Sequence, residues 1–240
     1  MRAIGFPTGA LALGDFRYGL KILAETNATA VELSALREAE LQPLLAALPE
    51  LDLRKYAHVS LHLPSSIQAG FEAKLLQLIQ DIPTEWPLIT HPNIINHWGA
   101  WKEFQGRVCV ENMDKRKEIG QSARHLRQIF DKLPDATFCF DIGHAHQVDP
   151  TMGEAVLILE EFQNKLCQLH VSEVNSESRH DPISLEAAMA FEVIAPLIPE
   201  DMPAILESRI PSGANPVDQV RSEIGIVNTV LSVSAQLVGD

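Results

Sequence analysis

The chain has little of what would place it in a membrane, in the secretory route or on nucleic acid. No apolar run approaches the roughly 20 residues that a membrane-spanning helix needs. The N-terminal segment has an early arginine, two glycines and a proline but no compact apolar stretch, so it is not typical of a signal peptide, and we expect a cytoplasmic protein. Basic residues are not in excess either. The net charge of −13 disfavours a broadly basic surface, and nucleic acid is therefore not an expected partner.

Cysteine is also scarce. The three cysteines, Cys109, Cys139 and Cys167, each lie within an apolar, strand-like segment. They lack the close pairing of a structural zinc site and the density of a disulfide scaffold, so we expect buried, reduced thiols. Linkers, low-complexity segments and shifts in composition are absent as well, and the sequence predicts a single domain over residues 1–240.

What the sequence does have is a regular alternation of two patterns. Short apolar segments predict eight strands, at residues 2–6, 30–34, 58–63, 87–90, 107–112, 137–141, 166–172 and 203–208. Helical spacing of apolar residues predicts helices between and after them, at 16–25, 37–51, 71–82, 94–104, 122–133, 154–166 and 215–237. Strands that alternate with helices predict a parallel sheet with right-handed crossovers.

Eight such units in 240 residues predict an α/β fold, a single (β/α)8 barrel. A doubly wound open sheet is the alternative architecture. It would be expected to carry a glycine-rich phosphate turn after an early strand, and the sequence has none. We therefore favour the barrel.

Six consecutive predicted strands end in, or carry near their ends, residues that are costly to bury: His62, His91, Glu111, Asp141, His170 and Glu207. In a (β/α)8 barrel the carboxyl ends of the strands meet at one mouth, where the active sites of this fold are built. Carboxylates and imidazoles crowded into one pocket would repel one another or be poorly solvated, and a divalent cation removes that cost. Mixed carboxylate and imidazole ligands suit zinc or manganese.

Taken alone, a histidine or glutamate at a strand end is more often a hydrogen-bonded structural residue than a ligand. We leave Glu32, His58, His97, His125 and His146 under that interpretation. For the strand-end set the structural interpretation would require six consecutive strands to end in potential ligands by accident.

The motifs HLP, THP, VENM, FDIGHA, LHVSE, SRH and LES follow one another in this order along the chain. They resemble the xylose-isomerase-like barrel superfamily, which holds the endonuclease IV type of apurinic endonucleases, the ketose 3-epimerases, the hydroxypyruvate isomerases and the inosose dehydratases. The resemblance implies that the common metal site of the superfamily consists of Glu111, Asp141, His170 and Glu207. It further implies a second zinc site, as in the endonucleases, from His62 and His91 with a bridging Glu111.

Three departures from these patterns bear on function. His144 and His180 match two of the three ligands of a third zinc in the endonucleases, but the aspartate of that site is replaced by Ser178, so we expect the third site to be weakened or absent. The position of an epimerase arginine is taken by Ser176, and that of an epimerase glutamate by Lys117. Neither branch is matched completely.

The first functional hypothesis is a metal-dependent isomerase or epimerase of a small polyhydroxy carbonyl compound. The metal would stabilise an enediolate as a Lewis acid, and Glu111 and Glu207, the acid-base pair that the resemblance implies, would remove and return the proton. His144, Arg179 and His180 would bind the substrate. The acidic charge and compact length fit a small neutral substrate.

The second hypothesis is an endonuclease IV-like hydrolysis of a phosphoester by two metal ions. His62 and His91 favour it, and the basic run from Lys115 to Lys117 lies on the mouth side, although a solvated loop explains that run more simply. Ser178 and the lack of extended basic or aromatic insertions for binding a duplex disfavour it. A non-catalytic binding module is the least supported interpretation, because the ligand set is too complete.

From the sequence we favour the isomerase or epimerase. The choice between the two chemistries, the substrate, the metal, the number of ions and the formation of a homo-oligomer all stay open at this stage.

Overall fold

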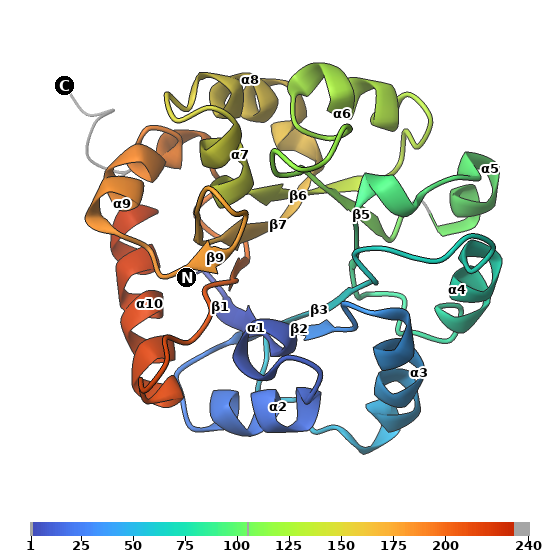
Figure 1. The fold of residues 1–240 in the computed structure, drawn as a ribbon, viewed down its shortest axis with the longest axis horizontal. Coiled ribbons are helices and arrows are strands. Elements are labelled where there is room, and N and C mark those ends of the chain that lie inside the picture. Colours follow the sequence, from blue (N-terminus) through green and yellow to red (C-terminus); the bar gives the residue numbers. More distant parts are fainter. Residues whose placement is uncertain (1, 105, 233–240) are drawn as a thin grey trace.

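Eight parallel strands close into a barrel, with helices around the outside (Figure 1). The computed structural model describes residues 2–104 and 106–232. Around the barrel the strands follow the order β1-β10-β7-β6-β5-β4-β3-β2, so each strand lies next to its predecessor among the barrel strands. Their bounds are β1 Ile4–Pro7, β2 Ala30–Ser34, β3 His58–His62, β4 Leu88–Thr90, β5 Val108–Glu111, β6 Thr137–Asp141, β7 Leu166–Val171 and β10 Ala204–Leu206. The predicted (β/α)8 barrel is confirmed.

The helices that cover the barrel are α1 Thr8–Ala12, α2 Phe16–Ala24, α3 Glu38–Ala47, α4 Glu72–Leu78, α5 Trp98–Trp101, α6 Ala123–Phe130, α7 Ile142–Val148, α8 Gly153–Phe162, α9 Leu185–Glu192 and α10 Pro216–Val230. Short 3-10 turns lie at Leu48–Glu50, Pro92–Ile94, Lys102–Phe104, Gln163–Lys165 and Ala195–Leu197. Strands β8 (Glu173–Val174) and β9 (His180–Asp181) form a small antiparallel pair after β7. The last helix is shorter than predicted, and residues 233–237 of that prediction lie outside the described part of the chain. None of the described helices is both long and apolar enough to cross a membrane.

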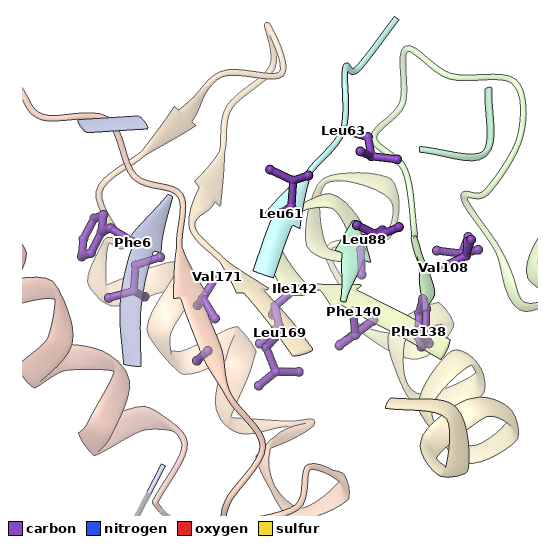
Figure 2. Packing of buried hydrophobic residues seen from close by; sticks show 14 of the residues in the cluster. Phe6, Leu61, Leu63, Leu88, Val108, Phe138, Phe140, Ile142, Leu169 and Val171 are labelled. Atoms are coloured by element: carbon purple, nitrogen blue, oxygen red, sulfur yellow. The ribbon is translucent and has the colours of Figure 1, made fainter. Parts of the chain in front are cut away.

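The two faces of each strand meet different surroundings, because successive side chains of a strand point to opposite sides. Val108 and Val110 of β5 belong to the large apolar core between the barrel and its helices. Figure 2 shows side chains of this core along neighbouring strands, among them Leu61, Phe138 and Leu169. This layer fixes the helices on the strands, and the opposite faces of the strands fill the barrel.

The barrel interior holds a separate small cluster of Ile89, Cys109 and Cys139, with Cys167 packed against it. All three cysteines are free thiols. Burial raises the pKa of the Cys109 and Cys139 thiols well above the ordinary value. They are therefore packing residues below the mouth of the barrel, as the alternation along β5 and β6 predicts.

Candidate metal centre

The residues predicted as ligands meet at the carboxyl ends of the strands, from which they project toward one another. The described residues include four overlapping groups whose possible ligand atoms lie within 4.8 Å of one another. One consists of Glu111, Asp141, His170 and Glu207, a second of His62, His91 and Glu111, a third of Asp141, His144 and His180, and a fourth of Glu32, His62 and Glu207. Because the possible ligand atoms of a group are all close to one another, each group has the spacing that a single cation requires.

Glu111 lies at the centre of the first two groups. Its Oε2 atom is 3.1 Å from Nε2 of His91 and 3.4 Å from Nε2 of His62. Its Oε1 atom is 3.5 Å from Nδ1 of His170, which is itself 3.4 Å from Oε1 of Glu207. The two oxygens of one carboxylate thus face two different sets of ligands, the arrangement of a carboxylate that bridges two metal ions.

The donor set fits a cation, because several of its buried atoms have no hydrogen-bond partner. These atoms are Glu111 Oε2, Asp141 Oδ2, His170 Nδ1, Glu207 Oε2 and His91 Nδ1. Buried polar atoms in folded proteins are almost always paired, so unpaired atoms that face one another indicate a missing partner. Glu111 Oε2 and Nδ1 of His170 face partners within the two groups centred on Glu111. Asp141 Oδ2 instead lies 3.3 Å from Nδ1 of His144, and Glu207 Oε2 lies 3.4 Å from Nδ1 of His180.

Local structure positions Asp141 for this role. It ends β6 and is also the N-cap of α7, where its Oδ1 accepts a hydrogen bond from the backbone N–H of His144 at 2.7 Å. Asn112, the residue after β5, donates from its side-chain amide to the Asp141 carbonyl at 2.8 Å and accepts from the Asp141 N–H at 2.7 Å. These bonds tie the ends of β5 and β6 together and leave Oδ2 of Asp141 free to face the site.

Three of the histidines are held by neighbouring polar atoms. Nδ1 of His62 lies 2.6 Å from the Leu63 carbonyl, and Nδ1 of His144 lies 2.9 Å from the Asn112 carbonyl. A carbonyl only accepts, so each of these Nδ1 atoms carries a proton, and in the neutral imidazole Nε2 then has the lone pair. For His62, this lone pair is directed at Glu111. Nδ1 of His180 is 2.8 Å from the Ser172 hydroxyl.

The third group is present in a form that the sequence did not predict. Ser178, expected to weaken this site, bonds to Gln147 and to Asp114 and does not approach as a ligand. Asp141, shared with the first group, supplies the carboxylate beside His144 and His180. Asp114 adds a second one, 3.9 Å from Nε2 of His144. This carboxylate is already bound by Arg116, so it is a weaker donor than the carboxylates of the first two groups.

Burial and neighbouring charges shift the pKa values of the acids and imidazoles of the cluster in different directions. Burial disfavours ionised Glu111, but the charges of His91 and His170 outweigh it and hold the Glu111 pKa well below its ordinary value. Burial, together with the charges of Glu111 and Asp141, raises the pKa of Glu207 well above its ordinary value. Burial lowers the pKa of His180 to about 3. A cation would favour ionised Glu207, because it would offset the repulsion from the neighbouring carboxylates.

A cavity of about 250 Å³ opens beside these ligands, at the mouth of the barrel. One wall is apolar and includes Leu13 and Leu36. The lining also includes three cationic side chains, those of Arg116, Lys117 and Arg209. His144 and His180, predicted to bind substrate, line the cavity together with Glu207 and Glu111.

Arg179, the remaining predicted substrate ligand, lies elsewhere. It is exposed and forms an ion pair with Glu177 at 2.8 Å, and it is not among the residues that line the cavity. Arg209, which follows β10, takes a place at the rim instead. Its guanidinium donates to the His180 carbonyl at 3.2 Å and to Asp181 at 3.0 Å.

Two buried carboxylates outside the predicted ligand set touch the site: Glu32, which is left as a structural residue in the interpretation of the sequence, and Asp114, which is not considered there. Glu32 is fully buried and lies 3.0 Å from Nε2 of His170. Its position in the middle of an apolar strand was a signal, since a carboxylate is not buried there without a polar partner. Asp114 is held by Arg116, whose guanidinium counters the effect of burial and lowers the Asp114 pKa to about 2. Asp114 lies in a short loop of acidic and basic residues, and such a loop does not by itself indicate a buried carboxylate.

Comparison with known proteins gives matches in structure but not in sequence. No family model matches the chain, and no curated protein matches it. Endonuclease IV from Thermus thermophilus aligns over 96% of this chain and 99% of its own length, with a TM-score of 0.60 and 16% identity. A putative sugar phosphate isomerase/epimerase from Anabaena variabilis aligns over 97% and 99%, with a TM-score of 0.62 and 14% identity.

A third similar structure is the 3-keto-D-glucoside 4-epimerase YcjR from E. coli, with a TM-score of 0.56 and 12% identity over 95% of this chain and 100% of that one. All three are barrels of the xylose-isomerase-like kind. The similarity that the strand-end motifs predict is therefore confirmed for the fold. At identities this low the similarity shows the fold and leaves the chemistry to the site.

Proposed function

We propose that the protein is a divalent-metal-dependent enzyme that hydrolyses a phosphoester of a small molecule. The observation that carries this proposal is the position of the Glu111 carboxylate between two ligand sets, one with His170 and one with His62 and His91. A site for one ion leaves His62 and His91 without a role. Two ions held by such a carboxylate supply a nucleophile and stabilise both the attacking and the leaving oxygen of an in-line displacement.

The chain's own residues would hold the ions and orient the phosphoryl group. Glu111, Asp141, His170 and Glu207 would hold one ion, and His62, His91 and Glu111 the other. Zinc fits best, because imidazole and carboxylate are among its preferred ligands, and manganese is the alternative.

The cationic rim supports a substrate with a phosphoryl group. Lys117 and Arg116 lie on the loop after β5, and Arg209 lies after β10, so the cations approach the cavity from two sides. Two of them are already paired, Arg116 with Asp114 and Arg209 with Asp181. Among residues 2–104 and 106–232 no carboxylate pairs with Lys117, which leaves its ammonium group free to bind an anionic oxygen.

The size and lining of the cavity support a small substrate rather than a duplex. A volume of about 250 Å³ is slightly below the range of drug-sized ligand pockets, roughly 300–1,000 Å³. Leu13 is 69% exposed, and with Leu36 it forms an apolar wall beside the ligands. The substrate would place its phosphoryl group at the ligands and a less polar part against this wall.

The test combines metal analysis with an assay of hydrolysis. Purified protein should contain two or more ions per chain, and should release nitrophenol from nitrophenyl phosphate esters. His62→Gln and His91→Gln should each remove an ion and the hydrolysis, while His125→Gln, on α6 away from the cavity, should change neither. A single ion per chain, unchanged in His62→Gln and His91→Gln, would refute the bridged centre.

The isomerase or epimerase is the second candidate, and one observation favours it. Glu111 and Glu207 both line the cavity and both approach Nδ1 of His170, at 3.5 and 3.4 Å, so two carboxyl groups lie beside the space for a substrate. Two such groups can act as base and acid in proton transfer. On this alternative a ketose or ketose phosphate would exchange a carbon-bound proton with deuterated water, and the exchange would survive His62→Gln and His91→Gln but not Glu207→Gln.

A further inference from the structure

Glu32 is a carboxylate inside the barrel that the proposed chemistry does not use. It lies on β2, is fully buried, and points across the interior to His170 of β7. Strands β2 and β7 are not neighbours, since β1 and β10 lie between them in the barrel. The contact is therefore not a consequence of strand pairing; it depends on the side chains.

The two nitrogens of His170 face opposite partners. Nε2 lies 3.0 Å from Oε2 of Glu32. Nδ1 faces the ligand group, 3.5 Å from Glu111 and 3.4 Å from Glu207, and has no hydrogen-bond partner. One imidazole thus connects Glu32 to the centre of the four-residue site.

This arrangement determines which nitrogen of His170 carries the proton. An ionised carboxylate can only accept, so at 3.0 Å Glu32 requires N–H at Nε2. In the neutral imidazole, the form that binds a metal, the lone pair is then on Nδ1. In the other tautomer the amide of Gln168, also 3.0 Å from Nε2, would donate to that nitrogen. A lone pair would then face the Glu32 carboxylate, which is repulsive.

Neighbouring side chains hold Glu32 in place. Ser60, its partner in the register of β2 and β3, donates to Oε2 at 3.2 Å. The amide of Gln168 donates to the same oxygen at 2.8 Å. The amide orientation is set in turn by His58, whose Nε2 lies 2.7 Å from Oε1 of Gln168. The carboxylate therefore has little freedom to turn away from His170.

We propose that Glu32 is a positioning residue of the metal centre, which fixes the proton of His170 on Nε2 and directs Nδ1 at the ion shared with Glu111, Asp141 and Glu207. This inference rests on the proposed metal centre but not on the choice between hydrolase and isomerase. Partners of ligating histidines raise the basicity of the ligand and fix the ring, and their loss lowers metal affinity about 10–100-fold.

The experiment measures the zinc affinity of the full chain by competition with a chromogenic chelator, together with the 15N chemical shifts of the His170 ring. Glu32→Gln keeps the shape of the side chain but lets an amide donate toward His170. We expect the tightest zinc site to weaken about 10–100-fold and the proton of His170 to move partly to Nδ1. Glu32→Asp keeps the charge and should recover part of the affinity. Glu72→Gln, the loss of another buried carboxylate with no contact to a ligand, is the control and should leave zinc affinity unchanged.

The outcomes separate this inference from the proposed function. Wild-type zinc affinity and an unchanged His170 tautomer in Glu32→Gln would overturn the inference and leave the metal centre standing. An equal loss in Glu72→Gln would also overturn it, because a general loss of stability would then explain the effect. If the wild-type chain binds no zinc or manganese, the proposed function fails, and the positioning role fails with it. If Glu32→Gln does not fold, the comparison of Glu32→Asp with the wild type decides.

Discussion

Replacing Lys117 with Met separates a phosphate-binding cation from an ordinary surface lysine. Lys117 lines the cavity and is partly buried, and its side chain has no carboxylate partner in the described part of the chain. Met keeps the apolar stem and removes only the charge and the three N–H donors. Lys115, two residues earlier, provides a matched control because it is exposed and does not line the cavity.

The size of the effect follows from the environment of Lys117. A hydrogen bond between charged partners contributes about 1.5–3 kcal/mol. We take the lower part of this range, about 1.5–2 kcal/mol, because the side chain is only partly buried. At about 1.4 kcal/mol for each factor of ten, Lys117→Met should weaken phosphate binding roughly 10–30-fold. Exposed charge pairs contribute about 0.2–1 kcal/mol, so Lys115→Met should change it at most about fivefold.

The assay is inhibition by inorganic phosphate of nitrophenyl phosphate hydrolysis, with the KM for the ester measured in parallel. In Lys117→Met both the inhibition constant and KM should rise by the same factor, while kcat changes less, because the lost contact is made to the ground state as well as to the transition state. Equal effects in the two lysine variants, or no effect in Lys117→Met, would refute the proposed binding of phosphate by Lys117. A small loss in both variants would mean that only the general field of the basic run acts on phosphate.

Two further predictions concern the framework around the site. Glu72 is buried and accepts four hydrogen bonds. Two come from backbone N–H groups, and two come from the side chains of His97 and Trp101, which follow β4. Glu72→Gln should lower the free energy of unfolding in urea by about 1.5–3 kcal/mol, with the exposed Glu103→Gln as control. These bonds outweigh burial and lower the pKa of Glu72 below 4.5. The difference in unfolding free energy between the wild type and Glu72→Gln should therefore be fully present above the ordinary pKa and shrink as pH falls through the folded pKa. A difference that is independent of pH down to about pH 2 would contradict this account. At Gly143 an added Cβ would lie 2.4 Å from the Ser172 carbonyl, so Gly143→Ala should lower the free energy of unfolding by about 1–3 kcal/mol and reduce metal content. Gly225→Ala, with open space on α10, is the control and should be neutral or stabilising by up to about 1 kcal/mol. Equal stability of the two alanine variants would count against this interpretation.

Much of the framework can be predicted from local pattern. The strand at residues 107–112 illustrates this, because its apolar run and its period of two place Cys109 and Glu111 on one face before any contact is known. The structure confirms the strand and places Cys109 in the barrel interior directly below Glu111. The same parity holds for Cys139 and Asp141 on β6. Because every parallel strand of a barrel ends at the same mouth, the sequence also predicts which residues come together.

Other features depend on distances between segments that local pattern does not contain. From the sequence, Arg179 is expected in the site and Arg209 is not considered, yet Arg209 lines the cavity and Arg179 pairs with Glu177 instead. The consequence of Ser178 also could not be anticipated, since the aspartates near His144 come from the ends of β5 and β6.

The alternation of strands and helices, the closure of the barrel and the positions of the candidate ligands at the strand ends could be predicted from the chain alone. Each of these follows from the spacing of apolar and polar residues along the chain, which acts over a few residues. The folded structure was needed to see that Glu111 faces two groups of candidate ligands and that Glu32 reaches His170 across the barrel. Both relations join strands that are far apart in the chain, and they depend on side-chain directions at separations of 3.0–3.5 Å, which are set only when the whole barrel closes.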